Sequence, residues 1–178
     1  FVDVIEAGSN WWVGGWNSAP TMTSADIQPD PAYTTSALLG YCRADDSESD
    51  NVTFHYQWYN NSVSVETGYN STSLISGEEH VIHALTSGNI SKGENWTFAC
   101  IAQDDLANAS AWINDSVLIS NTAPTAFTSV VLAATNTSLN NTNQNLTVTW
   151  TDGSDSDSDA IYNITDWRLN STSIAVLN

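Results

Sequence analysis

Apolar residues occupy every second position in several short stretches of the chain, and each stretch is bounded by Gly, Asn or Asp. Four such stretches are 38–42, 52–58, 96–100 and 117–119, and a fifth is 146–150. A period of two predicts β-strands with one buried face. The segment 78–85 fits either a short strand or a helical turn. The pattern therefore predicts an all-β chain.

The chain also repeats itself. Residues 17–21 recur as 121–125, and residues 46–65 match 155–174, with eight identities in 24 positions when 42–65 is aligned with 151–174. The repeat length of about 104 residues suits one β-sandwich. We predict antiparallel β-sandwiches in tandem: a complete unit at 19–122 (the first unit), a partial unit at 123–178 (the second unit), and the terminal strand of a further unit at 1–18.

The repeat makes two detailed predictions for the second unit. The alternation of Leu146, Val148 and Trp150 puts Trp150 where Cys42 sits, with a loop one residue longer before Asp159, so no equivalent disulfide is expected there. The segment 161–167 takes the place of the strand at 52–58, which puts Asn163 at the inward position of Phe54. A glycan cannot enter a core, so either that site is unmodified or the strand carries a bulge.

Asparagine occurs unusually often in the glycosylation motif Asn-Xaa-Ser/Thr. The chain holds 12 such motifs, where its composition alone gives about 4.6. Glycans require exposed positions and an exported protein, so we predict covalent N-linked glycans on an extracellular or cell-surface chain. The acceptors are Asn51, Asn60, Asn70, Asn89, Asn95, Asn108, Asn114, Asn136, Asn140, Asn145, Asn163 and Asn170.

Two cysteines, Cys42 and Cys100, are expected to form a disulfide in an exported chain, and without nearby histidine ligands they do not suggest zinc. A cysteine, a strand tryptophan 16 residues later and a second cysteine on a late strand resemble the immunoglobulin (Ig) pattern. Phe98 replaces the tyrosine of the antibody-type corner. The chain is more similar to tandem Ig-like or PKD-like domains of archaeal and bacterial surface glycoproteins, through 45–50, 57–60, 93–100 and 121–125. Its segment 166–178 resembles a lead-in to laminin-G-like domains. The resemblance implies spacers, adhesin stalks or surface filaments.

Acidic loops are the first candidate site. If the loops at 45–50 and 104–105 emerge at one end of a sandwich, their carboxylates could bind Ca²⁺, which takes six to eight oxygen ligands. The alternative is a solvated acidic loop. The candidate ligands are Asp45, Asp46, Glu48, Asp50, Asp104, Asp105, Asp155, Asp157 and Asp159, with Asp152 beside the last three.

Tryptophans near the beginning of the chain are a second candidate site. Trp11, Trp12 and Trp16 fit either sugar stacking or, as we favour, docking of the strand 1–18 on a neighbouring subunit. His80 and His83 lack a third metal ligand and are expected to be ordinary surface or half-buried residues. The sequence contains no nucleophile elbow, phosphate loop or distinct acid–base pair, so we do not expect an enzyme.

The net charge of the chain limits the kinds of partner that it can bind. Three Lys and Arg against 20 Asp and Glu give a net charge of −17, which opposes binding to nucleic acid, and no apolar run is long enough to span a bilayer. Two functions stay open: a filament or surface-layer subunit, and a stalk segment of a larger adhesin. In the filament, residues 1–18 of one copy would complete 123–178 of the next, head to tail. Together these parts are shorter than one unit and lack the strand equivalent to 96–100.

Overall fold

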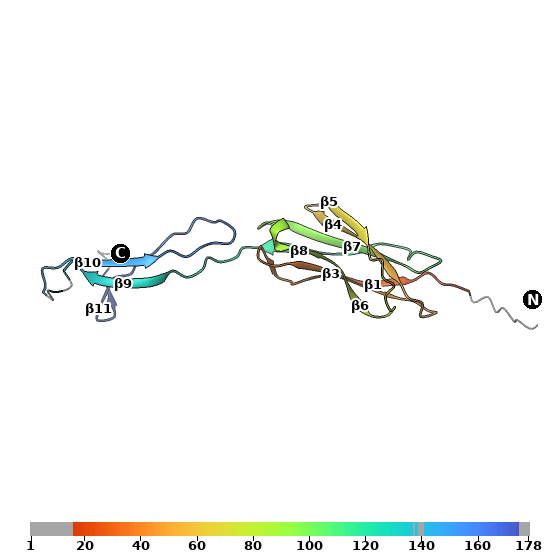
Figure 1. Ribbon diagram of the computed structural model, residues 1–178, viewed down its shortest axis with the longest axis horizontal. Helices are drawn as coiled ribbons and strands as arrows, with labels where there is room; N and C mark the ends of the chain where they lie inside the picture. The colour runs from red at the N-terminus through yellow and green to blue at the C-terminus, as the bar shows by residue number, and fades with distance from the viewer. Residues whose placement is uncertain (1–15, 137, 139–140, 175–178) are drawn as a thin grey trace, which may run out of the picture.

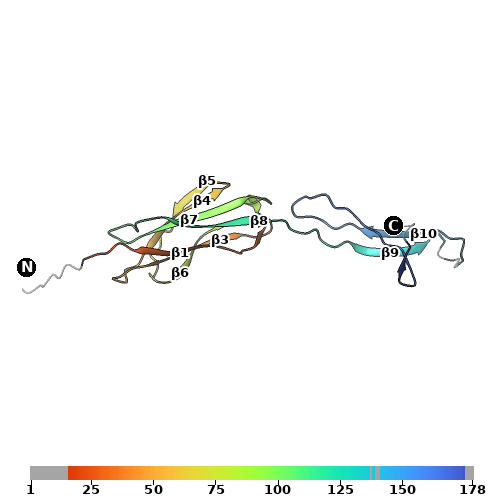
Figure 2. The same cartoon turned by 180° about the vertical axis from the view of Figure 1, so that it is seen from behind.

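The structure is a computed structural model that describes residues 16–136, 138 and 141–174, and it is almost entirely β. Two bodies of β-structure lie end to end along the long axis (Figures 1 and 2). The first holds strands β1 to β8 and the second holds β9 to β12. All strands fall within the predicted bounds of the two units, which we keep as their names.

The first unit is a sandwich of two sheets. The smaller sheet has the order β1-β3-β6 and consists of β1 (Thr21–Gln28), β3 (Leu38–Asp45) and β6 (Glu79–Leu85). The larger sheet has the order β2-β8-β7-β4-β5 and consists of β2 (Ala32–Tyr33), β8 (Ile113–Ser120), β7 (Asn95–Gln103), β4 (Thr53–Asn60) and β5 (Val63–Tyr69). All pairings are antiparallel except that between β2 and β8. A 3-10 turn, η1 (Ser87–Asn89), precedes β7.

The core lies between these sheets and is formed by the positions that alternate in the sequence. Trp58 and Phe98 are fully buried with ring centroids 4.7 Å apart. The predicted disulfide between Cys42 and Cys100 is present, and it joins β3 of one sheet to β7 of the other. The segment 78–85, left open by the sequence, is strand β6, because it pairs with β3 over its length. The alternation therefore located β3, β4, β7 and β8, but it did not predict β1, whose Ile27 is fully buried.

The second unit is formed by two small sheets. Strand β9 (Thr128–Ala134) pairs with β10 (Leu146–Thr151), and a short hairpin joins β11 (Arg168–Leu169) to β12 (Thr172–Ser173). The hairpin repeats the turn between β4 and β5. Asn61 and Ser62 have φ of 47° and 68°, and Asn170 and Ser171 have 49° and 69°. Such paired positive φ values are those of a two-residue type I′ turn.

The prediction of a strand at 161–167 is wrong. Strand β4 pairs with β7 along its whole length in the first unit, and the described second unit has no counterpart of β7. Without that partner only the tip of the hairpin forms ladder bonds. Asn163 consequently lies outside any strand, so a bulge does not arise. It is exposed, and its Nδ2 donates to Asp152 Oδ1 at 2.8 Å.

Candidate functional site: the joint between units and the open face of the second unit

An acidic loop at the N-terminal end of the first unit holds the linker that leads into it. Asp46 Oδ1 accepts the backbone N–H groups of Glu48 and Asp50, both at 3.0 Å, and Ser49 has a φ of 64°. The fold thus presents the Glu48 carboxylate to the linker. Ser18 donates to it through its backbone N at 3.2 Å and its Oγ at 3.1 Å. The Ser18 backbone hydrogen bond is the main cause that lowers the pKa of Glu48.

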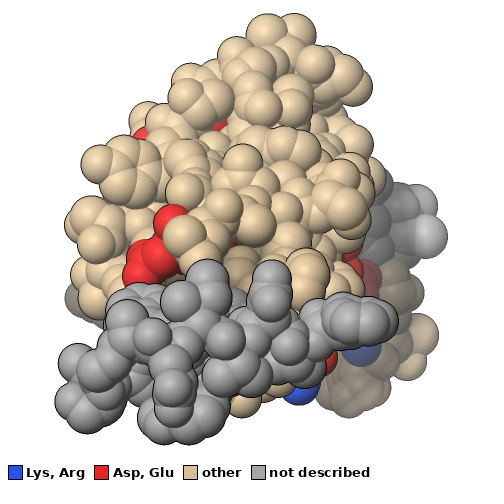
Figure 3. Space-filling view, turned by 90° about the vertical axis from the view of Figure 1, so that its right-hand side faces the viewer, with Lys and Arg blue, Asp and Glu red and all other residues tan. Residues whose placement is uncertain are grey.

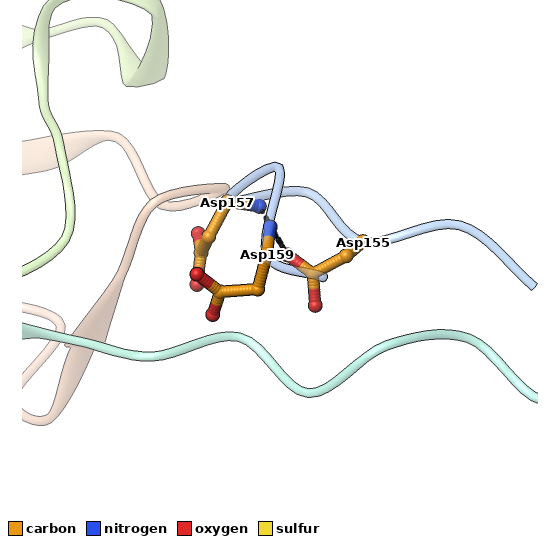
Figure 4. A group of neighbouring side chains, drawn as sticks. All are labelled: Asp155, Asp157 and Asp159. Atoms are coloured by element: carbon orange, nitrogen blue, oxygen red, sulfur yellow. Dashed lines mark hydrogen bonds between the residues drawn. The ribbon is translucent and has the colours of Figure 1, made fainter. Parts of the chain in front are cut away.

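The same arrangement of an aspartate loop and its backbone hydrogen bonds recurs between the two units (Figure 4). Asp155 Oδ1 accepts the backbone N–H groups of Asp157 at 2.8 Å and Asp159 at 3.1 Å, and Ser158 has a φ of 62°. Thr122, which is the repeat equivalent of Ser18, donates its backbone N–H to Asp157 Oδ2 at 2.6 Å. Both repeats therefore share the hydrogen bond between a linker backbone N–H and a loop carboxylate, in addition to their similar sequence.

The first unit reaches across this joint with two side chains of its own. Thr34 Oγ1 donates to Asp157 Oδ1, and Lys92 Nζ lies 2.5 Å from both carboxylate oxygens of Asp159. The Thr34 hydrogen bond is the largest cause that lowers the pKa of Asp157, and the Asp159 hydrogen bond is the largest that raises the pKa of Lys92. These shifts mean that the joint favours an ionised Asp157 and a protonated Lys92.

The three basic residues are all engaged by aspartates. Arg43 pairs with Asp45 at 3.4 Å, Lys92 with Asp159, and Arg168 with Asp166. Within the described residues Lys92 also acts on Asp157 and Asp155 through its charge, and no other lysine or arginine is left for the remaining carboxylates. Figure 3, which looks along the chain at the first unit, shows carboxylates on a surface that is mostly uncharged.

The structure brings together some of the predicted calcium ligands. Asp155, Asp157 and Asp159 offer oxygens within 4.8 Å of one another, and they are the one such group in the described part of the chain. Glu48 and Asp104 do lie at one end of the first unit, because the neighbouring residues Ser18 and Asn17 bind them. Asp45 pairs with Arg43, while Asp50, Asp105 and Asp152 are exposed.

Asp104 is the buried acid of the first unit, with 5 % of its surface exposed. Its Oδ2 accepts Asn17 Nδ2 at 3.0 Å, and its Oδ1 accepts the backbone N–H groups of Leu106 and Ala107, both at 2.6 Å. Burial opposes ionisation, but these hydrogen bonds outweigh it and hold the pKa of Asp104 below its ordinary value. Asp104 therefore fixes the linker to the first unit through its hydrogen bond with Asn17.

The second unit has an open apolar face. A groove of ≈ 350 Å³ lies between β9, β10 and the segment that precedes β11. Its apolar lining is Phe127, Val130, Leu132, Val148, Trp150, Ile164 and Trp167. Val148 pairs with Leu132 as Gly40 pairs with Ile27 in the first unit. Leu132 is 59 % exposed whereas Ile27 is fully buried, because β7 and β8 cover the corresponding face of the first unit.

Most predicted glycan acceptors lie on the surface. Nine are exposed, Asn60 and Asn70 are half-buried, and Asn140 lies outside the described residues. The Asn70 carboxamide accepts the Phe54 backbone N–H and donates to the Thr72 carbonyl. Asn60 Oδ1 is buried without a hydrogen-bond partner. Of the predicted docking tryptophans, Trp16 is 93 % exposed, while Trp11 and Trp12 lie outside the described residues.

The sequence reasoning missed the first unit's share of the joint. Lys92 is the only lysine of a chain this acidic, and that scarcity was the available signal. His83, expected to be an ordinary surface or half-buried residue, accepts the Trp58 indole N–H at 3.1 Å and lies 3.1 Å from Glu66.

Comparison with known proteins finds no family model that matches the chain and no curated protein that resembles it. The described residues include no helix with the length and apolar character needed to cross a membrane.

Proposed function

We propose that this chain is a structural subunit of a glycosylated extracellular filament or cell-surface layer, built from Ig-like sandwiches joined end to end. The observation that carries the proposal is the open face of the second unit beside a closed first unit of the same repeat. An apolar groove with half-exposed leucine and valine side chains favours association, because covering it removes apolar surface from water.

The sheet order of the first unit supports the Ig-like assignment. Strands β1, β3 and β6 face β2, β8, β7, β4 and β5, and the disulfide joins β3 to β7. A buried tryptophan on β4, Trp58, occupies the place of the tryptophan that marks Ig domains. Proteins of this architecture serve many functions, so the fold alone supports a scaffold and no particular chemistry.

The strand that fits the groove is one equivalent to β8. Residues 1–18 align without gaps to 105–122, which includes β8, and place Val13 on the buried Val117. We propose that this strand from one copy completes the second unit of the next. A contact between different surfaces of successive copies does not close on itself, so it propagates as a filament.

Microscopy of groove variants tests the proposal. Wild type should form filaments in negative stain, and Val148→Asp should abolish them by placing a charge in the groove. Thr149→Asp places the same charge at the next residue, which is exposed, so this variant is the matched control and should polymerise. A synthetic peptide of residues 1–18 should cap growth of the wild-type chain, which keeps the test valid if Val148→Asp disturbs the second unit. Filaments from both variants, or failure of the peptide, would refute strand exchange.

A mass measurement addresses the alternative function. If the native polypeptide is much larger than 19.2 kDa plus glycan, the chain is a segment of a stalk, and strands from the same polypeptide complete the second unit. A native mass that corresponds to this chain favours the filament.

We also propose that calcium stiffens the joint, on one specific observation. Asp46 Oδ2 and Asp155 Oδ2 are both buried without a hydrogen-bond partner, at equivalent places in the two repeats. A desolvated carboxylate oxygen is costly unless a proton donor or cation satisfies it. Asp155, Asp157 and Asp159 would supply hard oxygen ligands of the kind calcium binds. Melting temperature with calcium and with a chelator should differ, and equal values would reject the site.

A further inference from the structure

The outer face of the larger sheet of the first unit is hollowed at its middle. Gln57, Ala99 and Asn114 lie in one row across β4, β7 and β8, and Tyr59 and Thr97 are paired in the next row. Ala99 forms the floor, because its side chain is too small to fill the space between longer neighbours. These residues and Trp112, just before β8, line a hollow of ≈ 380 Å³.

The hollow combines aromatic rings with fixed polar groups. Trp112 is 47 % exposed and Tyr59 is half-buried, so both rings present part of their surface to solvent. The Tyr59 hydroxyl donates to Gln57 Oε1 at 2.7 Å, and Gln57 Nε2 donates to Ser64 Oγ at 2.6 Å. These bonds hold the tyrosine and the glutamine in place before any ligand arrives. Apolar rings beside hydroxyl and amide groups match a sugar, whose rings carry C–H faces and hydroxyl edges.

A predicted glycan acceptor lies at this hollow. Asn114 lines it, belongs to a glycosylation motif, and is exposed. Its carboxamide makes no side-chain hydrogen bond with the described residues, in contrast to that of Asn70, which is engaged on both sides. A sugar attached at Asn114 would be confined beside Tyr59 and Trp112, and tethering gives such a contact a high effective concentration.

We propose that the hollow binds the first sugar residues of a glycan on Asn114, with the Trp112 and Tyr59 rings as stacking walls. The inference rests on the proposed glycosylation and adds to it a specific site where the glycan is bound to the protein surface. The glycan would thereby cover the middle of an otherwise exposed sheet face and become part of the folded first unit.

The test is a thermal double-mutant cycle on the glycosylated chain. Asn114→Gln, which removes the glycan, should lower the melting temperature of the first unit by about 4 °C, the shift of one stacked ring in a domain of this size. In a Trp112→Ala background the same change should have a clearly smaller effect, because one of the two stacking rings is gone and only Tyr59 remains. Asn51→Gln, an exposed motif outside the hollow, is the matched control and should act equally in both backgrounds.

Two further measurements decide the outcome. Sugar proton resonances of the Asn114 glycan should move upfield through the indole ring current and return to ordinary values in Trp112→Ala. Site-resolved mass spectrometry separates this inference from the proposal beneath it. If no motif carries a glycan, the proposed glycosylation itself fails. If other sites are occupied but Asn114 is bare, or if its glycan shows no coupling to Trp112, the glycosylated chain stands and the binding site is refuted.

Discussion

Loss of the disulfide should destabilise the first unit far more than the second. Cys42 and Cys100 are fully buried and close a loop of 58 residues. The chain-entropy relation gives about 4 kcal/mol for such a loop, which is a large share of the stability of one domain. With about 2.1 cal/mol/K of unfolding entropy per residue, a unit of about 104 residues should melt roughly 18 °C lower.

Calorimetry of the chain with and without reductant measures this effect. The double variant Cys42→Ala/Cys100→Ala should fall by at least as much as the reduced wild type, because two small cavities add to the loop term. The second unit supplies an internal control, since Trp150 stands where Cys42 does and no bond joins its sheets. A first unit whose melting is unchanged by reduction would refute the reasoning, and so would a transition of the second unit that moves equally.

Three further outcomes are expected. Because the pKa of Asp157 is lowered in the folded joint, this carboxylate stabilises the joint above its ordinary pKa of 3.8, and the stabilisation is lost as the pH falls through the folded pKa. The pKa of Lys92 is raised above 10.5, so the stabilisation that Lys92 gives the joint is lost only in strong base. X-ray scattering should therefore show a fixed joint at pH 7 that loosens progressively as the pH is lowered below 3.8, and a profile that stays the same down the acid series would contradict this. Gly40→Ala should cost about 1–3 kcal/mol in urea unfolding, since its new Cβ would lie 2.6 Å from the Phe98 ring, and an unchanged midpoint would argue against that packing. Ser62→Gly should raise stability by about 0.5–1 kcal/mol because glycine accepts a φ of 68° without strain, and a lower melting temperature would show that the turn is not type I′.

Alternation along the chain was enough to place four core strands of the first unit, though not β1, which contributes the buried Ile27. Leu38 and Cys42 are buried in β3, and Trp58 and Phe98 are buried opposite them, as a period of two requires. The repeat was informative for a different reason: it transferred the turn at Asn61 to Asn170 with nearly the same backbone angles. Local patterns of this kind depend on neighbours a few residues apart, and a sequence displays those directly.

Contacts between distant segments were beyond the same reasoning. Lys92 and Asp159 are 67 residues apart, and only the geometry of the joint brings them together. The strand expected at 161–167 failed because a strand depends on its ladder partner as much as on its own residues. Asn60 and Asn70 read as glycan acceptors like the other ten, yet their carboxamides are half-buried, which a three-residue motif cannot reveal.

The duplicated aspartate loop has a consequence for any long row of these units. Each loop fixes the segment that enters its own sandwich, and Thr34 and Lys92 of the preceding sandwich bind the same loop, so in such a row these few bonds would determine the angle at every junction. A constant rotation and rise per step generates a helix, and stiffness along it becomes a property of nearest neighbours alone. Pitch could then be adjusted by changing one residue in the repeating hinge, without altering either sandwich.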